Sequence, residues 1–153
     1  MRSKLIGIVA AVLALATAGG AMAAATAGSG RDASAAAAKV TVQSSRYGKV
    51  LFDGRGYSLY LFAADKGKRS TCYGGCAKAW PPFLTKGKPT VAGGANARLL
   101  GTTRRRDGSL QVTYAGHPLY YYEGDGKGEV KCQNVSNFGG LWLLVRANGK
   151  AVR

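Results

Sequence analysis

GYSLYLFAADKGKRSTC at residues 56–72 and GHPLYYYEGDGKGEVKC at residues 116–132 are two versions of one pattern, set 60 residues apart. The identical or similar pairs are Gly56/Gly116, Leu59/Leu119, Tyr60/Tyr120, Phe62/Tyr122, Asp65/Asp125 and Cys72/Cys132. Farther along the chain the offset becomes 62, and Trp80 then aligns with Trp142. Since Tyr, Asp and Cys recur in the same order, the pattern indicates an internal duplication.

Each repeat is predicted to begin as a β-hairpin. The runs Tyr57–Phe62 and His117–Tyr122 are rich in aromatic residues and leucine, and each follows a Gly-containing turn signal. Strand-like segments precede both of them, at Lys49–Phe52 and Leu110–Tyr114.

Three further elements complete the expected fold. A strand at Arg98–Thr103 turns at Asp107-Gly108, and the unbroken apolar run Leu141–Val145 predicts a buried strand. The only good helix candidate is Gly75–Trp80, which Pro81-Pro82 closes. We therefore expect a mainly β protein: two related β-hairpin-plus-loop repeats that form one small β-rich domain with one short helix.

The alternation of side chains predicts which aromatic residues are buried. Tyr60 and Phe62 share a face, as do Tyr120 and Tyr122, and these are expected to line the core. One face of the sheet is then packed inward and the other is partly solvated. Tyr57 and Tyr121 would point outward, where they are candidates for stacking on sugars or other flat ligands.

The N-terminal segment predicts export. Residues 1–23 have a positive start, an apolar run and the small-x-small sequence Ala21-Met22-Ala23, which is typical of a secretory signal cleaved near Ala23. The apolar run is too short for a membrane anchor, so no transmembrane span is expected after processing. Residues 24–39 are an alanine-rich linker of low complexity. The domain is expected at 40–153, with its repeats at about 47–84 and 107–146.

Three linked motifs give a family resemblance. Tyr60–Asp65 and Tyr120–Asp125 both fit Tyr-x-aromatic-x-x-Asp, and Cys72–Pro82 fits Cys-x-x-x-Cys-Ala-x-x-Trp-Pro-Pro. Over about residues 47–146 the chain resembles the bacterial predicted lipoproteins, also called the secreted repeat of unknown function. The resemblance implies an exported cell-envelope or extracellular protein without an established role. This chain lacks the lipid-attachment cysteine found after the signal of many relatives, which favours free secretion.

Three cysteines allow three disulfide pairings. By chain entropy a Cys72–Cys76 bridge is worth about 2 kcal/mol, and either bridge to Cys132 about 4 kcal/mol. Geometry favours the short bridge, because Cys76 lies one turn into the predicted helix and Cys72 lies just before it. We choose Cys72–Cys76, with Cys132 free or an alternative partner. The rival interpretation is a redox or metal-handling protein that uses all three cysteines, with His117 as a further metal ligand.

The remaining chemistry-bearing residues favour structural roles. His117, the only histidine, is expected at an exposed turn, and Asp65 and Asp125 are expected to accept backbone hydrogen bonds that fix the loops after them. No nucleophile motif accompanies these residues. We therefore expect no catalytic residue, no metal and no cofactor, in a protein that is not an enzyme.

Basic charge is the strongest indication of a partner. The chain has 22 basic and 7 acidic residues, a formal charge of +15, and removal of Arg2 and Lys4 with the signal leaves +13. Arg104, Arg105 and Arg106 are expected at a solvated hairpin tip, and Lys66, Lys68 and Arg69 crowd a loop of the first repeat. This charge predicts weak, salt-sensitive association with anionic cell-wall or surface polymers. No nucleic-acid-binding motif is present, so specific recognition of nucleic acid is not expected.

Overall fold

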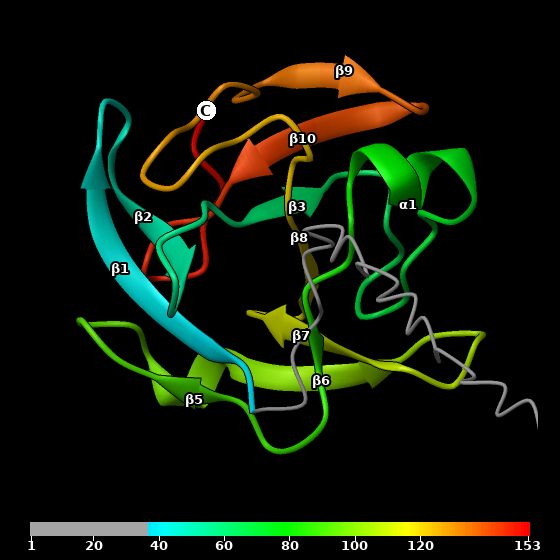
Figure 1. Cartoon of the computed structure of the whole chain (residues 1–153), viewed down its shortest axis with the longest axis horizontal. Coiled ribbons are helices and arrows are strands. Elements are labelled where there is room, and N and C mark those ends of the chain that lie inside the picture. Colours follow the sequence, from blue (N-terminus) through cyan, green and yellow to red (C-terminus); the bar gives the residue numbers. More distant parts are fainter. Residues whose placement is uncertain (1–36) are drawn as a thin grey trace, which may run out of the picture. The chain divides into compact units, whose positions relative to one another are not determined.

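A computed structural model describes residues 37–153. The predicted signal segment and most of the predicted linker lie outside these residues. Within them the domain is mainly β with one short helix, which confirms the predicted fold class (Figure 1). Ala38 is already buried and the first strand begins at Lys39, at the very end of the predicted linker.

The elements follow one another in this order: β1 (Lys39–Ser45), β2 (Gly48–Asp53), β3 (Tyr60–Phe62), α1 (Gly75–Ala79), β4 (Leu84–Thr85), β5 (Thr90–Val91), a 3₁₀ turn (Ala97–Leu99), β6 (Leu100–Arg104), β7 (Leu110–Tyr114), β8 (His117–Tyr120), β9 (Val135–Asn137) and β10 (Gly140–Leu144). The helix ends where Pro81-Pro82 approaches, as predicted. The predicted strand at Arg98–Thr103 is shifted, because the 3₁₀ turn occupies its first residues.

The strands form two sheets. A small sheet has the order β2-β1-β5, and a large sheet has the order β4-β7-β8-β3-β10-β9, with β6 also paired to β7 (Figure 1). The central strands β3 and β8 come from different repeats and run antiparallel, with Tyr60 opposite Tyr120. Tyr60 and Tyr120 are equivalent residues of the two repeats and face each other in an antiparallel pair. The two repeats are therefore related by an approximate twofold axis that passes between these tyrosines.

The repeats are interleaved rather than side by side. The Ala63 amide, after β3, donates to the Leu141 carbonyl of the second repeat at 2.8 Å. In the equivalent contact the Glu123 amide donates to the Ala79 carbonyl of the first repeat at 3.0 Å. β3 therefore lies between two strands of the second repeat, β8 and β10. β8 lies between β3 and β7 of its own repeat, and Pro82 of the first repeat pairs with Tyr120 at its end.

Both faces of the central strands are buried, which corrects the expected one-sided sheet. Tyr60, Phe62 and Tyr120 enter one core cluster on one face. Leu59, Leu61 and Leu119 enter a second cluster, because alternate residues point to opposite faces of a strand. Leu59 and Leu119 share this second cluster, as the repeat alignment predicts.

The aligned tryptophans meet at the approximate axis. The Trp80 and Trp142 rings are stacked with centroids 3.9 Å apart and planes within 3°. Tyr60 contacts Trp80 edge-on at 5.3 Å, and Tyr120 contacts Trp142 in the same way at 5.2 Å. This stack joins the two repeats through the first core cluster.

Candidate anion-binding surface

The motif aspartates hold the loops that follow them. Asp65 Oδ1 accepts hydrogen bonds from the backbone N and Oγ1 of Thr71 at 2.7 and 2.9 Å. Asp125 Oδ1 accepts the backbone N–H of Lys131, also six residues downstream, at 2.9 Å. These bonds confirm the predicted loop-fixing role. Burial raises the pKa of Asp65, although the hydrogen bonds from Thr71 and Tyr120 oppose that rise.

The second oxygen of each aspartate contacts a tyrosine of the other repeat. Tyr60 Oη donates to Asp125 Oδ2 at 2.6 Å, and Tyr120 Oη donates to Asp65 Oδ2 at 2.7 Å. The alignment of the repeats matches tyrosine with tyrosine and aspartate with aspartate. It therefore could not predict that each tyrosine bonds to the aspartate of the other repeat. The motif residues Tyr60, Phe62, Asp65, Tyr120, Tyr122 and Asp125 thus belong to the core and to the contact between repeats.

Asp65 opens a loop that presents three cations. Lys66 and Arg69 exchange backbone hydrogen bonds of 3.2 Å in both directions, which closes a tight turn. The side chains of Lys66, Lys68 and Arg69 are exposed.

Arg105 does not belong to a solvated tip, which corrects the sequence prediction. Its side chain is only 5% exposed. Nη1 donates to Ser70 Oγ and Gln111 Oε1, at 2.8 and 2.7 Å, and Nη2 donates to the Cys72 carbonyl at 2.8 Å. These acceptors are neutral, and Arg105 forms no ion pair with a carboxylate of residues 37–153. Arg105 therefore fastens the β6–β7 turn to the loop of the first repeat, because its two terminal nitrogens bond to Ser70 and Cys72 of that loop and to Gln111 of β7.

Tyr73 completes this junction, and the sequence analysis did not single it out. Two guanidinium groups contact its ring, with Arg105 Cζ 4.4 Å and Arg106 Cζ 4.3 Å from the ring centroid. The backbone N–H of Arg106 also donates to Tyr73 Oη at 3.3 Å. The stack holds two like charges near each other through cation–π contacts.

The structure thus brings together two basic segments that are about 35 residues apart in sequence. We use the name basic end for their exposed cations: Lys66, Lys68, Arg69, Arg104 and Arg106. Asp107 is also exposed at the β6–β7 turn, where it accepts hydrogen bonds from Ser109. The basic end carries a clear excess of positive charge.

Tyr121 does not point outward, contrary to the sequence prediction, and Tyr57 is half-buried beside it. Tyr121 is half-buried against the second core cluster, and its Oη donates to Asp53 Oδ2 at 2.9 Å. Tyr57 meets the Tyr121 ring edge-on at 6.4 Å, and the Arg55 guanidinium lies over both rings. The second core cluster accounts for this difference, since it gives Tyr121 an apolar surface to pack on.

The cysteines follow the chosen pairing. Cys72 and Cys76 form a disulfide with their Cα atoms 5.3 Å apart, and Cys132 is free and half-buried. Burial raises the pKa of the Cys132 thiol, although a hydrogen bond with Tyr122 opposes that rise. Across residues 37–153, no three His, Cys, Asp or Glu side chains gather in a way that could hold a metal ion.

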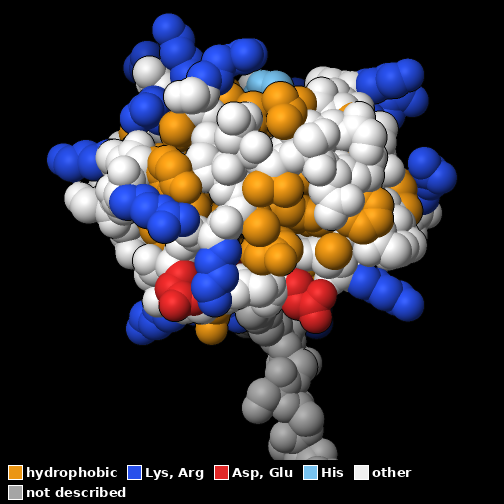
Figure 2. Space-filling view, turned by 90° about the horizontal axis from the view of Figure 1, so that it is seen from above, with side chains coloured by type: hydrophobic (Ala, Val, Ile, Leu, Met, Phe, Trp, Pro, Cys, Tyr) orange, Lys and Arg blue, Asp and Glu red, His pale blue; other side chains and the backbone are white. Residues whose placement is uncertain are grey.

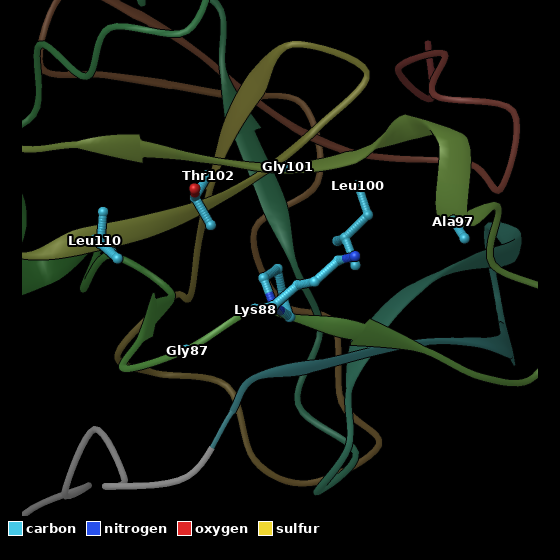
Figure 3. Close-up of a pocket in the computed structure, with 8 residues that line it drawn as sticks. Gly87, Lys88, Ala97, Leu100, Gly101, Thr102 and Leu110 are labelled. Atoms are coloured by element: carbon cyan, nitrogen blue, oxygen red, sulfur yellow. The ribbon is translucent and has the colours of Figure 1, made fainter.

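Neither pocket described here collects acid–base groups in a catalytic arrangement. One, of ≈ 300 Å³, offers the Lys88 amine and the Thr102 hydroxyl among glycines and aliphatic side chains, and Lys88 extends toward Leu100 (Figure 3). A second, of ≈ 350 Å³, is lined by Arg46, Glu129 and Lys131 among others. His117 is half-buried as the first residue of β8, and it lies outside both pockets.

Comparison with known proteins identifies the repeat. A family model described as a secreted repeat of unknown function matches residues 41–83 and 101–146. Both matches begin six residues before the predicted repeats (47 − 41 and 107 − 101), because β1 and β6 belong to the repeating unit. No curated protein and no solved structure gives a significant match. Within residues 37–153, no helix has the length and apolar character needed to cross a membrane.

Proposed function

The chain belongs to the family described as a secreted repeat of unknown function, of which it carries two copies, and we propose that it is an exported, non-enzymatic module that associates with anionic polymers of the cell envelope. Export would follow cleavage of the signal segment near Ala23, a proposal that rests on the sequence pattern there. The basic end would supply the binding surface.

The junction at Arg105 is the observation that carries this proposal. It joins exposed cations of two separate loops into one surface, although like charges repel each other. The buried Arg105 guanidinium adds positive potential beneath that surface, which the nearby carboxylates of Asp65 and Asp107 offset only in part. Anionic polymers such as teichoic acids or acidic glycans would offset this charge. The contacts would be exposed ion pairs, so the association would be weak and would fall as salt rises.

The test is sedimentation of the purified mature protein with purified cell walls over a series of salt concentrations. The variant Arg104→Ser/Arg106→Ser removes two exposed charges and leaves Arg105 in place. Lys150→Ser/Arg153→Ser is the matched control, since it removes the same charge near the C-terminus, on the side of the domain opposite the β6–β7 turn (Figure 1).

We expect the first variant to bind more weakly, with the slope of log K against log salt reduced by about 1–2. The control should lose less affinity, because only the general charge of the molecule has changed. Wild-type binding that is absent at low salt, or that is equal at low and high salt, would contradict the proposal.

A further inference from the structure

The turn between β9 and β10 presents a phenylalanine to solvent in an unfavourable backbone conformation. Phe138 and Gly139 form a two-residue hairpin turn, with φ of 53° and 82°. Asn and Gly are the residues that adopt positive φ readily, so a phenylalanine at the first position costs stability. Its side chain is nevertheless 47% exposed. Packing in the core therefore does not explain the choice of residue.

This hairpin is the most apolar exposed part of the described domain. Phe138 and Leu141 are its exposed large hydrophobic side chains within residues 37–153, and they lie three positions apart. No charged residue occurs from Gln133 to Val145, although the chain as a whole carries a charge of +15. The hairpin is held firmly, since Asn137 Oδ1 accepts the Phe138 N–H at 2.8 Å and the Asn137 carbonyl accepts Trp142 Nε1–H at 3.2 Å.

The apolar hairpin adjoins the Lys66–Arg69 loop of the basic end. A Cβ added to Gly140 would lie 2.8 Å from Ala64 Cβ, and Ala64 immediately precedes Asp65 and the basic loop. The β9–β10 and β6–β7 turns both lie on the α1 side of the domain (Figure 1). The face that carries β9 and β10 shows hydrophobic side chains toward its middle and Lys and Arg side chains around much of its rim, with acidic side chains near one edge (Figure 2).

We propose that this end of the molecule binds the surface of an anionic lipid bilayer, with the Phe138–Leu141 hairpin inserted among the headgroups. The inference rests on the proposed function for its electrostatic component. An exposed apolar tip beside a cluster of cations combines burial of apolar area with attraction to anionic headgroups. A second copy of the chain fits less well, because two basic ends would face each other. A neutral glycan would use the aromatic ring but would leave the cations without a partner.

The test measures sedimentation with two kinds of vesicle: phosphatidylcholine alone, and phosphatidylcholine mixed with phosphatidylglycerol. Wild type is compared with Phe138→Asn/Leu141→Thr and with Arg104→Ser/Arg106→Ser, and each protein is also tested on purified cell walls. Asn tolerates the positive φ of the turn, and Thr suits an exposed strand position, so the apolar-tip variant should keep the fold.

We expect wild type to bind the phosphatidylglycerol vesicles and to leave the neutral vesicles unbound. The apolar-tip variant should lose about five-fold or more of its vesicle partitioning, because it removes apolar area that would be buried in lipid. Its binding to cell walls should be unchanged. The arginine variant should lose binding to both targets.

Several outcomes would overturn the lipid proposal: equal binding to both vesicle types, an apolar-tip variant that partitions like wild type, or an equal loss of cell-wall binding in that variant. Each of these can occur while the arginine variant still fails on cell walls, so the proposed function would then survive. An arginine variant that binds walls like wild type would instead remove the proposed function. As a measurement independent of affinity, Phe138→Trp should show tryptophan fluorescence quenched by brominated lipids, and absence of quenching would count against insertion.

Discussion

Arg105 shows how a residue that looks like one of three surface cations has become part of the interior. Its guanidinium bonds to three neutral acceptors from two segments, and one of these acceptors, Gln111, donates in turn to the Leu119 carbonyl in β8 at 2.8 Å. The charge is therefore tied to the centre of the large sheet. Its neighbours Arg104 and Arg106 are exposed.

Replacement of Arg105 by Ser should lower the free energy of unfolding by about 2–4 kcal/mol, because buried acceptors would lose their donors. Arg104→Ser should change it by about 0.5 kcal/mol or less, as expected for a surface position, and Arg106→Ser by about 1 kcal/mol or less, because it also loses the cation–π contact with Tyr73. Urea denaturation of the three variants provides the measurement. Equal, small effects at all three positions would show that Arg105 is no more structural than its neighbours.

Two buried tyrosines predict a loss of stability at alkaline pH. Burial, and the carboxylates of Asp125 and Asp65 beside them, raise the pKa values of Tyr60 and Tyr120 well above the usual value near 10. Above pH 10 the unfolded chain therefore releases protons that the folded domain retains. Their contribution to stability is fully present below about pH 10 and is lost as the pH rises further, at about 1.4 kcal/mol per pH unit for each tyrosine.

Urea unfolding between about pH 9 and pH 11 measures this slope. The variant Tyr60→Phe should be less stable at neutral pH, and its alkaline slope should be smaller by about 1.4 kcal/mol per pH unit. The two effects are separable in a plot of the free energy of unfolding against pH. The lost hydrogen bond lowers the whole curve, and the lost titration changes its slope above about pH 10. A wild-type stability that stays flat through this range would contradict the prediction.

At the scale of elements, the decisive contact is the exchange of tyrosine–aspartate bonds between β3 and β8. Each repeat supplies the tyrosine of one bond and the aspartate of the other. Since each aspartate also holds the loop that follows it, the geometry of a loop in one repeat depends on a strand of the other.

A double-mutant cycle tests this dependence. Tyr60→Phe combined with Asp125→Asn should show a coupling energy of about 1–3 kcal/mol in the free energy of unfolding, the range for residues in one hydrogen-bond network. Tyr60→Phe combined with Asp65→Asn joins residues of the same motif that share no direct hydrogen bond, and it should show distinctly less coupling. The reverse order of coupling energies would exclude the exchange between repeats.

For the whole molecule, interleaving predicts that one repeat does not fold by itself. A fragment of residues 37–94 would lack β8 and β10, which pair with the two edges of β3. It would also lack Trp142, whose ring is stacked on Trp80. We expect the fragments 37–94 and 95–153, cut beside the exposed Gly94, to be unstructured when separate. Mixing them should restore the β-sheet circular dichroism of the full chain. A fragment that shows cooperative unfolding alone would indicate that the repeats are independent units.

Local patterns in the sequence were sufficient for the fold class, the repeat and the short helix, and they favoured the observed disulfide without excluding a bridge to Cys132. Turn glycines, alternating apolar residues and the Pro81-Pro82 stop act over a few neighbouring residues, so their consequences can be derived without knowledge of distant partners. The Cys72–Cys76 bridge is of the same kind, because the helix that begins at Gly75 brings Cys76 back toward Cys72.

Contacts between distant segments were decided only by the tertiary structure. Packing in the second core cluster buries Tyr121 and the leucine side chains of β3. Hydrogen bonds to Ser70 and Cys72 hold the Arg105 side chain in the interior. The approximate twofold axis places an aspartate of the other repeat beside each motif tyrosine. None of these follows from residue type or spacing, because arginine and tyrosine are equally suited to solvent and to a buried site that satisfies their polar atoms. The sequence by itself determined the helix and most hairpin strands of the two repeats, but it did not predict β1, β4, β5 or β9, of which β4 and β5 form by pairing with the distant strands β7 and β1. The packing of one repeat into the other determined which side chains remained available to a partner.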